Sequence, residues 1–262
     1  MSKKNYPTIL AYWLPVLWLV TGICHATDDN KINVTVGGYS FPPYVVVNSS
    51  GYTGVVPEMV EALNELESQY NFSFVPTSVS NRYEAFSRHR FDLLFFESPE
   101  WGWENTAKSV LPLNVEDGEV FIGLKPQAAA EGYFDNLQQK RLLLVRGYHY
   151  RIVGFETDEA KLKHDFLAAL VPDTQAAIEG LLLERGDVSP VSQSFLNWYL
   201  GQNPQKAERI FISSRWDQQY QHAALIHPQS RIAKEQLQLL IGQLESEGTF
   251  ADILNKYYLK QR

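Results

Sequence analysis

The chain has 262 residues, of which 45% are hydrophobic and 13% aromatic, with 30 acidic and 23 basic side chains. This composition is that of a globular protein and excludes low-complexity and disordered classes. The acidic balance argues against nucleic acid as a partner, because nucleic-acid-binding domains carry a basic surface.

The first 26 residues resemble an export signal. Lys3 and Lys4 form a basic start, residues 9–23 form an apolar run of 15 residues, and Ala26 ends a stretch suited to cleavage. A run of this length is typical of a signal peptide and short for a membrane span. We predict cleavage after Ala26 and a periplasmic location. An uncleaved anchor, or lipidation at Cys24, are the alternatives.

Cys24 is the single cysteine, so the cleaved chain would contain none. This excludes disulfides, a thiol nucleophile and a cysteine-ligated metal. Removing Lys3 and Lys4 from 23 basic residues leaves 21 against 30 acidic ones, a net charge of −9.

The first half of the remaining chain alternates between strand and helix patterns. A helix is predicted over residues 55–70, where Met59, Val60 and Leu63 share one face, and a short helix over residues 81–90. Strands are predicted at 31–38, 72–79, 91–98 and 118–125. This order predicts an α/β fold with a helix-covered, mostly parallel sheet.

A second α/β unit follows a soft boundary near residues 127–136. Strands are predicted at 141–147, 209–214 and 222–228, and helices at 158–169 and 174–184. Two closing helices, over residues 230–244 and around Phe250 to Tyr257, have no strand after them. They must therefore pack on a unit that is already formed.

Motifs for catalysis, metals and cofactors are absent. The sequence has no GxSxG, HExxH or phosphate-binding glycine loop, and no two of its six histidines are spaced as a metal pair. Glu97 and Glu100 could act as acid and base, but solvated loop acids are the simpler interpretation. We predict no cofactor, no metal and no enzymatic activity.

Aromatic residues gather where predicted strands end. The candidate ligand-binding residues are Tyr39, Phe41, Tyr44, Glu97, Trp101, Arg146, Tyr148 and His149. The carboxyl ends of the strands are where open α/β sheets bind ligands. Prolines 42 and 43 hold the first group rigid, which reduces the entropy lost on binding. The sequence predicts a small-molecule cleft between two units; core packing of each aromatic is the alternative.

Four stretches in order resemble bacterial extracellular solute-binding proteins of family 3, the periplasmic amino-acid-binding type. They are residues 34–63, 83–100, 176–191 and 237–259, the last with the Gly-Thr turn at Gly248. The resemblance implies two lobes joined by two hinge crossovers. Lobe I would take residues 27–122 and 225–262, and lobe II residues 123–224.

The resemblance also implies a monomer that captures a small polar solute, an amino acid or a related amine or acid, for an inner-membrane ABC permease. A sensory receptor or a dehydratase-like enzyme on the same scaffold, with Glu97 or Glu100 opposite His149, are the alternatives. The family's arginine after the third strand is missing from ESPEWGWENT, and its second aspartate after Asp187 is also missing. Arg82, Arg146 or Arg151 could supply the guanidinium, while Glu97 and Trp101 could favour a cationic solute.

Overall fold

A computed structural model describes residues 1, 31–66, 68–125, 127, 128 and 130–259. The chain divides into two units, Met1–Asn30 and Lys31–Arg262, and the account below concerns the second. The predicted signal peptide and its cleavage site lie outside the described residues. Within the described residues, no helix is long and apolar enough to cross a membrane.

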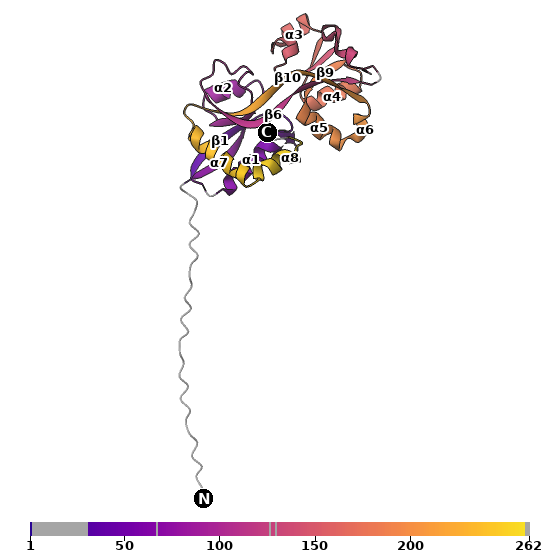
Figure 1. Ribbon diagram of the computed structural model, residues 1–262. Helices are drawn as coiled ribbons and strands as arrows, with labels where there is room; N and C mark the ends of the chain where they lie inside the picture. Colours follow the sequence, from indigo (N-terminus) through magenta and orange to yellow (C-terminus); the bar gives the residue numbers. More distant parts are fainter. Residues whose placement is uncertain (2–30, 67, 126, 129, 260–262) are drawn as a thin grey trace. The chain divides into compact units, whose positions relative to one another are not determined.

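The elements alternate as the sequence pattern indicates (Figure 1). The strands are β1 (Ile32–Gly38), β2 (Val46–Asn48), β3 (Gly51–Thr53), β4 (Tyr70–Pro76), β5 (Leu93–Glu97), β6 (Ser109–Leu124), β7 (Leu142–Val145), β8 (Ala168–Val171), β9 (Val188–Ser192) and β10 (Ile210–Ile226). The α-helices are α1 (Val55–Glu65), α2 (Arg82–Ser87), α3 (Glu159–Asp165), α4 (Thr174–Leu182), α5 (Gln193–Gln202), α6 (Pro204–Ala207), α7 (Lys234–Ser246) and α8 (Thr249–Lys256). Short 3-10 helices lie at Glu131–Phe134, Leu137–Gln139 and Arg151–Val153.

One continuous sheet has the strand order β4-β1-β5-β10-β6-β9-β7-β8, and β2 pairs only with β3. β1 runs parallel to β4 and β5, and β7 runs parallel to β8 and β9. The central strands β6 and β10 are antiparallel to each other and to their outer neighbours. Each end of the sheet is therefore parallel and helix-covered, as predicted.

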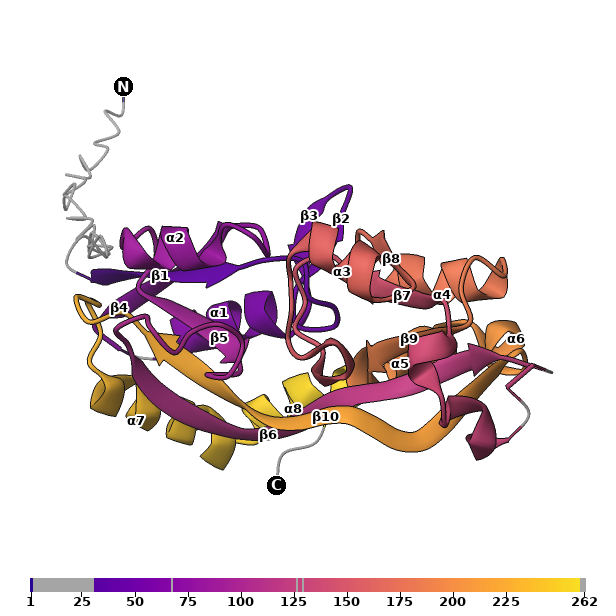
Figure 2. The same cartoon turned by 90° about the horizontal axis from the view of Figure 1, so that it is seen from above.

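Strands β6 and β10 join the two ends. They have 16 and 17 residues, well beyond the usual length of about 5–6. They lie side by side through both halves of the unit (Figure 2). Their pairing shifts register between Ile212 and Trp216, between Trp216 and Gln218, and between Gln221 and Ala223. Bulges of this kind bend a strand pair, and they place two bent crossovers between the lobes.

Each half has its own apolar core. One buried cluster combines residues from 34–115 with residues from 220–259, including Phe250 and Leu254 of α8. Two further clusters lie wholly within residues 120–210 and 121–188. The closing helices therefore pack on the half that contains the first part of the chain, and α7 and α8 both contact α1. We call the two halves lobe I and lobe II; the predicted boundaries between residues 122 and 123 and between 224 and 225 stay predictions.

Several elements differ from the sequence prediction. The helix predicted over 158–169 ends at Asp165, and Ala168 begins strand β8. A parallel partner, β7, is available there, and its backbone pairing outweighs the helix preference of the alanines. The strands predicted at 209–214 and 222–228 are one strand, β10, because its polar middle pairs with β6. Strand β9 and helix α5 were not predicted.

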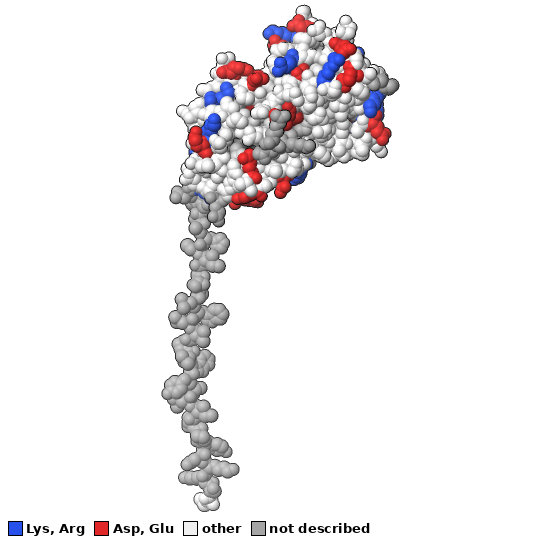
Figure 3. Space-filling view, in the orientation of Figure 1, with Lys and Arg blue, Asp and Glu red and all other residues white. Residues whose placement is uncertain are grey.

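Charged side chains of both signs are interspersed over the face shown in Figure 3, and neither sign forms a continuous patch there.

Candidate functional site

The loop after β1 is anchored on the start of α1. The amide of Val56 donates to the carbonyl of Tyr44 at 2.9 Å, and Phe41 and Val45 exchange backbone hydrogen bonds of 3.0 Å. Gly54 has φ 113°, and a Cβ there would lie 2.5 Å from the carbonyl oxygen of Pro43. Only glycine fits this approach, so the loop and the helix are held together by backbone geometry.

The rings of this loop form a packed row. Phe41 lies 6.1 Å from Tyr39 and 4.8 Å from Tyr44, measured between ring centroids. All three side chains are buried. They belong to the core of lobe I, and Tyr39 and Phe41 also form the wall that faces lobe II.

A small cavity lies where this wall meets lobe II. Its lining residues are Tyr39, Phe41, Val79, Arg82, Trp101, Glu119, Tyr148 and His149. Lobe I supplies the first five, crossover β6 supplies Glu119, and the segment after β7 supplies the last two. The space open to the centre of a water-sized sphere is about 20 Å³, which is room for about one water molecule.

The lobes touch across this cavity. The hydroxyl of Tyr148 donates to the carbonyl of Ser40 at 3.3 Å, and the Tyr148 ring meets Phe41 edge-on at 5.6 Å. A Cβ on Gly102 would lie 3.3 Å from Nε2 of His149. This is a closed arrangement, and a larger molecule can enter only when the lobes or their side chains move apart.

Trp101 has a packed ring and an unused donor. Its ring meets Phe41 at 5.7 Å and Tyr220 at 4.7 Å, both edge-on. Its indole Nε1 is buried and has no hydrogen-bond partner among the described residues. A buried donor without a partner is costly, so this N–H calls for an acceptor that is not part of the described chain.

Arg82 and Glu97 form a buried pair beside the cavity. Nε of Arg82 lies 3.7 Å from Oε1 of Glu97, and the two side chains are 2% and 1% exposed. Trp103 donates its indole N–H to Oε2 of Glu97 at 2.8 Å. Burial raises the pKa of Glu97, and the charge of Arg82 and the Trp103 hydrogen bond oppose that rise. Glu97 itself does not line the cavity.

Glu119 brings a carboxyl group to the cavity wall. Its Oε1 accepts the Tyr220 hydroxyl at 2.9 Å, while Oε2 is buried without a partner among the described residues. Burial, followed by the negative charge of Asp117, raises the pKa of Glu119 well above its usual range. The residues that line the cavity therefore hold two buried donors without a hydrogen bond, Trp101 Nε1 and Arg82 Nε, and one such acceptor, Glu119 Oε2.

His149 completes the lobe II side. Its backbone carbonyl accepts the side-chain amide of Gln218 at 2.6 Å, which fixes the segment to crossover β10. Burial, with a smaller effect from the Arg82 charge, lowers the pKa of His149 to about 4. The imidazole is therefore neutral at neutral pH.

Two of the predicted residues lie away from the cavity. Arg146 is exposed and forms an ion pair with Glu159 at 2.5 Å on the surface of lobe II. The hydroxyl of Tyr44 donates to Asp117 at 2.9 Å and bonds Nε2 of His222 at 2.7 Å at the crossovers. Thus Tyr39, Phe41, Trp101, Tyr148 and His149 meet at one cavity, while Tyr44, Glu97 and Arg146 do not line it.

Sequence reasoning missed Val79 and Glu119 and named Arg82 only as a substitute guanidinium. The signal for Glu119 was a carboxylate directly before the apolar run VFIGL, at a strand position that turns out 4% exposed. Arg82 begins the six-residue helix RYEAFS, which is followed by Arg88, His89 and Arg90, so its local sequence gave no comparable signal of burial. For Glu119, the adjacent apolar run places a charge where burial is expected.

Asp117 connects the two lobes at the crossovers. Its Oδ2 accepts the hydroxyl of Tyr44 from lobe I and the hydroxyl of Ser194 from α5 of lobe II, at 2.9 and 2.5 Å. Burial raises its pKa, and the Ser194 bond opposes that rise. This carboxyl group holds one residue of each lobe against the hinge.

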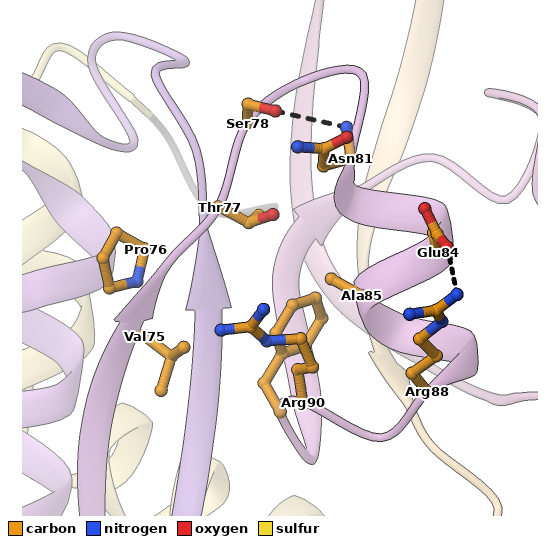
Figure 4. A pocket seen from close by; sticks show the side chains of 10 residues that line it. Val75, Pro76, Thr77, Ser78, Asn81, Glu84, Ala85, Arg88 and Arg90 are labelled. Atoms are coloured by element: carbon orange, nitrogen blue, oxygen red, sulfur yellow. Dashed lines mark hydrogen bonds and ion pairs between the residues drawn. The ribbon is translucent and has the colours of Figure 1, made fainter.

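Two wider hollows lie outside the interlobe cavity. One, of about 430 Å³, lies between β4 and α2 on lobe I, with Arg90 between Val75 and the helix (Figure 4). There Glu84 pairs with Arg88 at 2.6 Å, and both side chains are exposed. The other, of about 500 Å³, lies behind the crossovers beside Tyr220 and Tyr258. The interlobe cavity is the better candidate because its unpartnered polar atoms are buried.

Comparisons with known proteins find matches only at the level of structure. No protein-family model and no curated protein sequence matches the chain significantly. The ligand-binding core of GluR0 in complex with L-glutamate has a TM-score of 0.67 at 16% identity, covering 86% of this chain and 98% of that one. A histidine kinase sensor domain with similarity to periplasmic binding proteins has a TM-score of 0.66 at 16% identity, covering 89% and 100%.

A solute receptor for L-cysteine from Neisseria gonorrhoeae has a TM-score of 0.62 at 16% identity, covering 88% of this chain and 90% of that one. At these identities the likeness concerns the fold. The chain has the two-lobed periplasmic-binding-protein fold, and the resemblance to the amino-acid-binding type is confirmed at that level.

Proposed function

We propose that the protein is a periplasmic solute-binding protein that captures a small polar solute between its lobes. The observation that carries the proposal is the interlobe cavity, where Trp101 Nε1 and Glu119 Oε2 are buried without partners. A solute with a matching acceptor and donor would satisfy both atoms. Aromatic walls with a few convergent polar groups are the usual lining of a small-molecule site.

Capture would work by hinge motion. The crossovers β6 and β10 carry register shifts near Gln218 and Gln221, where bending is easiest. Opening would break the Tyr148–Ser40 hydrogen bond, and closure around a solute would restore it. The closed form would then bind either an inner-membrane ABC permease or a receptor. The similarity to a histidine kinase sensor domain supports the receptor as much as the similarity to the L-cysteine solute receptor supports the permease.

The enzyme alternative has less support. It needs Glu97 or Glu100 opposite His149, but Glu97 is held by Arg82 and Trp103, and Glu100 does not line the cavity. A general acid or base must reach the substrate within hydrogen-bond distance.

Native mass spectrometry of the protein purified from the periplasm tests the proposal. We expect a co-purifying small molecule, or, for empty protein, a rise in melting temperature with one member of a panel of amino acids, amines and small acids. Binding to the native state alone stabilises it by about 2.7 kcal/mol at 100 times Kd.

Two matched variants locate the site. Trp101→Phe removes the unpartnered indole N–H and keeps a ring, so affinity should fall. Trp198→Phe makes the same change on α5, away from the cavity, and should leave affinity unchanged. Absence of any bound or stabilising molecule, or equal effects of the two variants, would contradict the proposal.

A further inference from the structure

Resting on the proposed function, we propose that the captured solute is a small ammonium ion without an α-carboxylate, and that the Glu119 carboxylate binds its charge. The solute would be an amine with a short or aromatic body, lying among Tyr39, Phe41, Trp101 and Tyr148. The argument starts from the two charged side chains of the cavity, Arg82 and Glu119.

Arg82 is the only cation in the lining, and its guanidinium is already engaged. Its Nη1 donates to the carbonyl of Val79, its Nη2 donates to the hydroxyl of Tyr83, and its Nε faces Glu97 at 3.7 Å. A carboxylate is held strongly when two parallel N–H groups of one guanidinium edge are free. Nε makes no hydrogen bond and meets Glu97 by charge alone, but both Nη atoms already donate to protein oxygens. Either edge of the guanidinium includes at least one of these Nη atoms, so neither edge has two uncommitted nitrogens.

The rings around Arg82 reinforce this engagement. The guanidinium carbon lies 4.9 Å from the ring centroid of Tyr39 and 4.3 Å from that of Tyr83. Stacking on two rings fixes the plane of the guanidinium. Turning Arg82 towards a solute carboxylate would break these contacts and leave Glu97 buried without its cation, which costs several kcal/mol.

Glu119 is the opposite case. One carboxylate oxygen accepts the Tyr220 hydroxyl, and the other is buried at the cavity wall with no partner among the described residues. A carboxylate can accept about four hydrogen bonds, so it can take an ammonium N–H without losing Tyr220. Arg82 Nε also lacks a hydrogen bond, but its charge is paired with Glu97, so Glu119 is the charged group of the lining without a counter-charge.

The net charge of the lining points the same way. Arg82 and Glu97 cancel, while burial keeps Tyr39 and Tyr148 protonated by raising their pKa and keeps His149 neutral by lowering its pKa to about 4. Glu119 is left without a cation, and its raised pKa is the consequence. A cationic solute would supply the missing charge, whereas a zwitterion would bring a carboxylate with no partner.

The aromatic walls suit the same solute. Tyr39, Phe41, Trp101 and Tyr148 all line the cavity, and ammonium groups are attracted to aromatic faces. The indole N–H of Trp101 can then donate to one neutral acceptor, such as a hydroxyl or ether oxygen of the solute, or a water molecule. The cation of the lining, Arg82, already has Glu97 as its counter-charge, so the lining offers no partner for a carboxylate on the solute.

The test uses sets of three compounds that differ in one group. Each set contains an amine, the amino acid with the same side chain, and the neutral alcohol: phenethylamine, phenylalanine and 2-phenylethanol, or histamine, histidine and the imidazole alcohol. Agmatine with arginine and putrescine with ornithine add pairs. Isothermal titration of the wild-type protein should show at least one amine binding tenfold or more tightly than its amino acid and its alcohol.

Glu119→Gln keeps the shape and removes the charge, so amine affinity should fall at least tenfold. Glu100→Gln makes the same change at an exposed carboxylate nearby and should leave it unchanged. An amino acid that binds more tightly than its amine would overturn this inference and leave the proposed function standing. Failure of every amine, acid and amino acid to bind would overturn the proposed function itself. If Glu119→Gln does not fold, the three-compound comparison on the wild type decides alone.

Discussion

Replacing Glu97 by glutamine should strongly destabilise lobe I. The substitution keeps the side chain's shape and removes its charge, which leaves Arg82 as a cation that is 2% exposed. Trp103 keeps an oxygen acceptor in the amide, so its 2.8 Å hydrogen bond can persist. The effect therefore isolates the charge pairing.

The magnitude follows from burial. Removing one partner of a buried ion pair costs about 3–5 kcal/mol, because the remaining charge stays desolvated. For a protein of this size each kcal/mol lowers the melting temperature by roughly 2–4 °C, so we expect a fall of about 6–20 °C. An exposed pair gives the scale for comparison: Arg146 and Glu159 are 55% and 42% exposed, and such pairs contribute about 0–1 kcal/mol.

Urea denaturation followed by tryptophan fluorescence measures the change, with Glu159→Gln as the matched control. A second variant, Arg82→Met with Glu97→Leu, removes both charges and should recover much of the lost free energy of unfolding. If Glu97→Gln costs no more than Glu159→Gln, the reasoning is refuted. In that case Glu97 is protonated in the folded protein, and Arg82 is satisfied by Val79, Tyr83 and the two tyrosine rings.

Three further predictions concern the hinge and the loop. Burial lowers the pKa of His222 to about 3, so below about pH 6.5 the unfolded chain takes up a proton that the folded one does not, and stability falls as the pH drops towards 3. From pH 6.5 to 5 this loss is about 1.7 kcal/mol. Urea titrations of His222→Gln should show a pH dependence weaker by that amount, and an identical slope would contradict the assignment. Tyr44→Phe removes the hydroxyl that Asp117 and His222 share and should cost about 1–3 kcal/mol of unfolding free energy, whereas a change within about 0.5 kcal/mol would show that neither partner needs it. Gly54→Ala must clash with the carbonyl oxygens of Pro43 and Tyr44, so thermal melting should show a loss of more than about 2 kcal/mol of unfolding free energy. The control Gly242→Ala lies in α7 with nothing within 4 Å of its Cβ and should raise the unfolding free energy by up to about 1 kcal/mol. Equal shifts in the two variants would contradict the close approach at Gly54.

The sequence by itself determined the local elements and their class. Alternating residues near 31–38, the apolar run near 91–98 and the helical stripe from Val55 are patterns of neighbouring residues, and the corresponding elements β1, β5 and α1 are present. The order of these elements, with four resembling stretches, was enough to predict two lobes joined by crossovers. The rigid loop around Phe41 was also predictable from the sequence, because proline and glycine restrict or permit backbone conformations at their own positions.

Only the tertiary structure decided which side chains meet. Strand β8 and the unbroken length of β10 depend on partners far along the chain, β7 and β6, which local preference cannot reveal. Glu97 on β5 and Glu119 on β6 are both buried carboxylates beside apolar runs, and β10 separates their strands in the sheet. Their local sequence does not show which of them has a cationic partner. Glu97 faces Arg82 and Trp103, while Glu119 lines the cavity and its Oε2 is buried without a partner among the described residues. The sequence specifies that a side chain is charged. Whether the charge has an oppositely charged or hydrogen-bonding partner depends on residues that folding brings next to it.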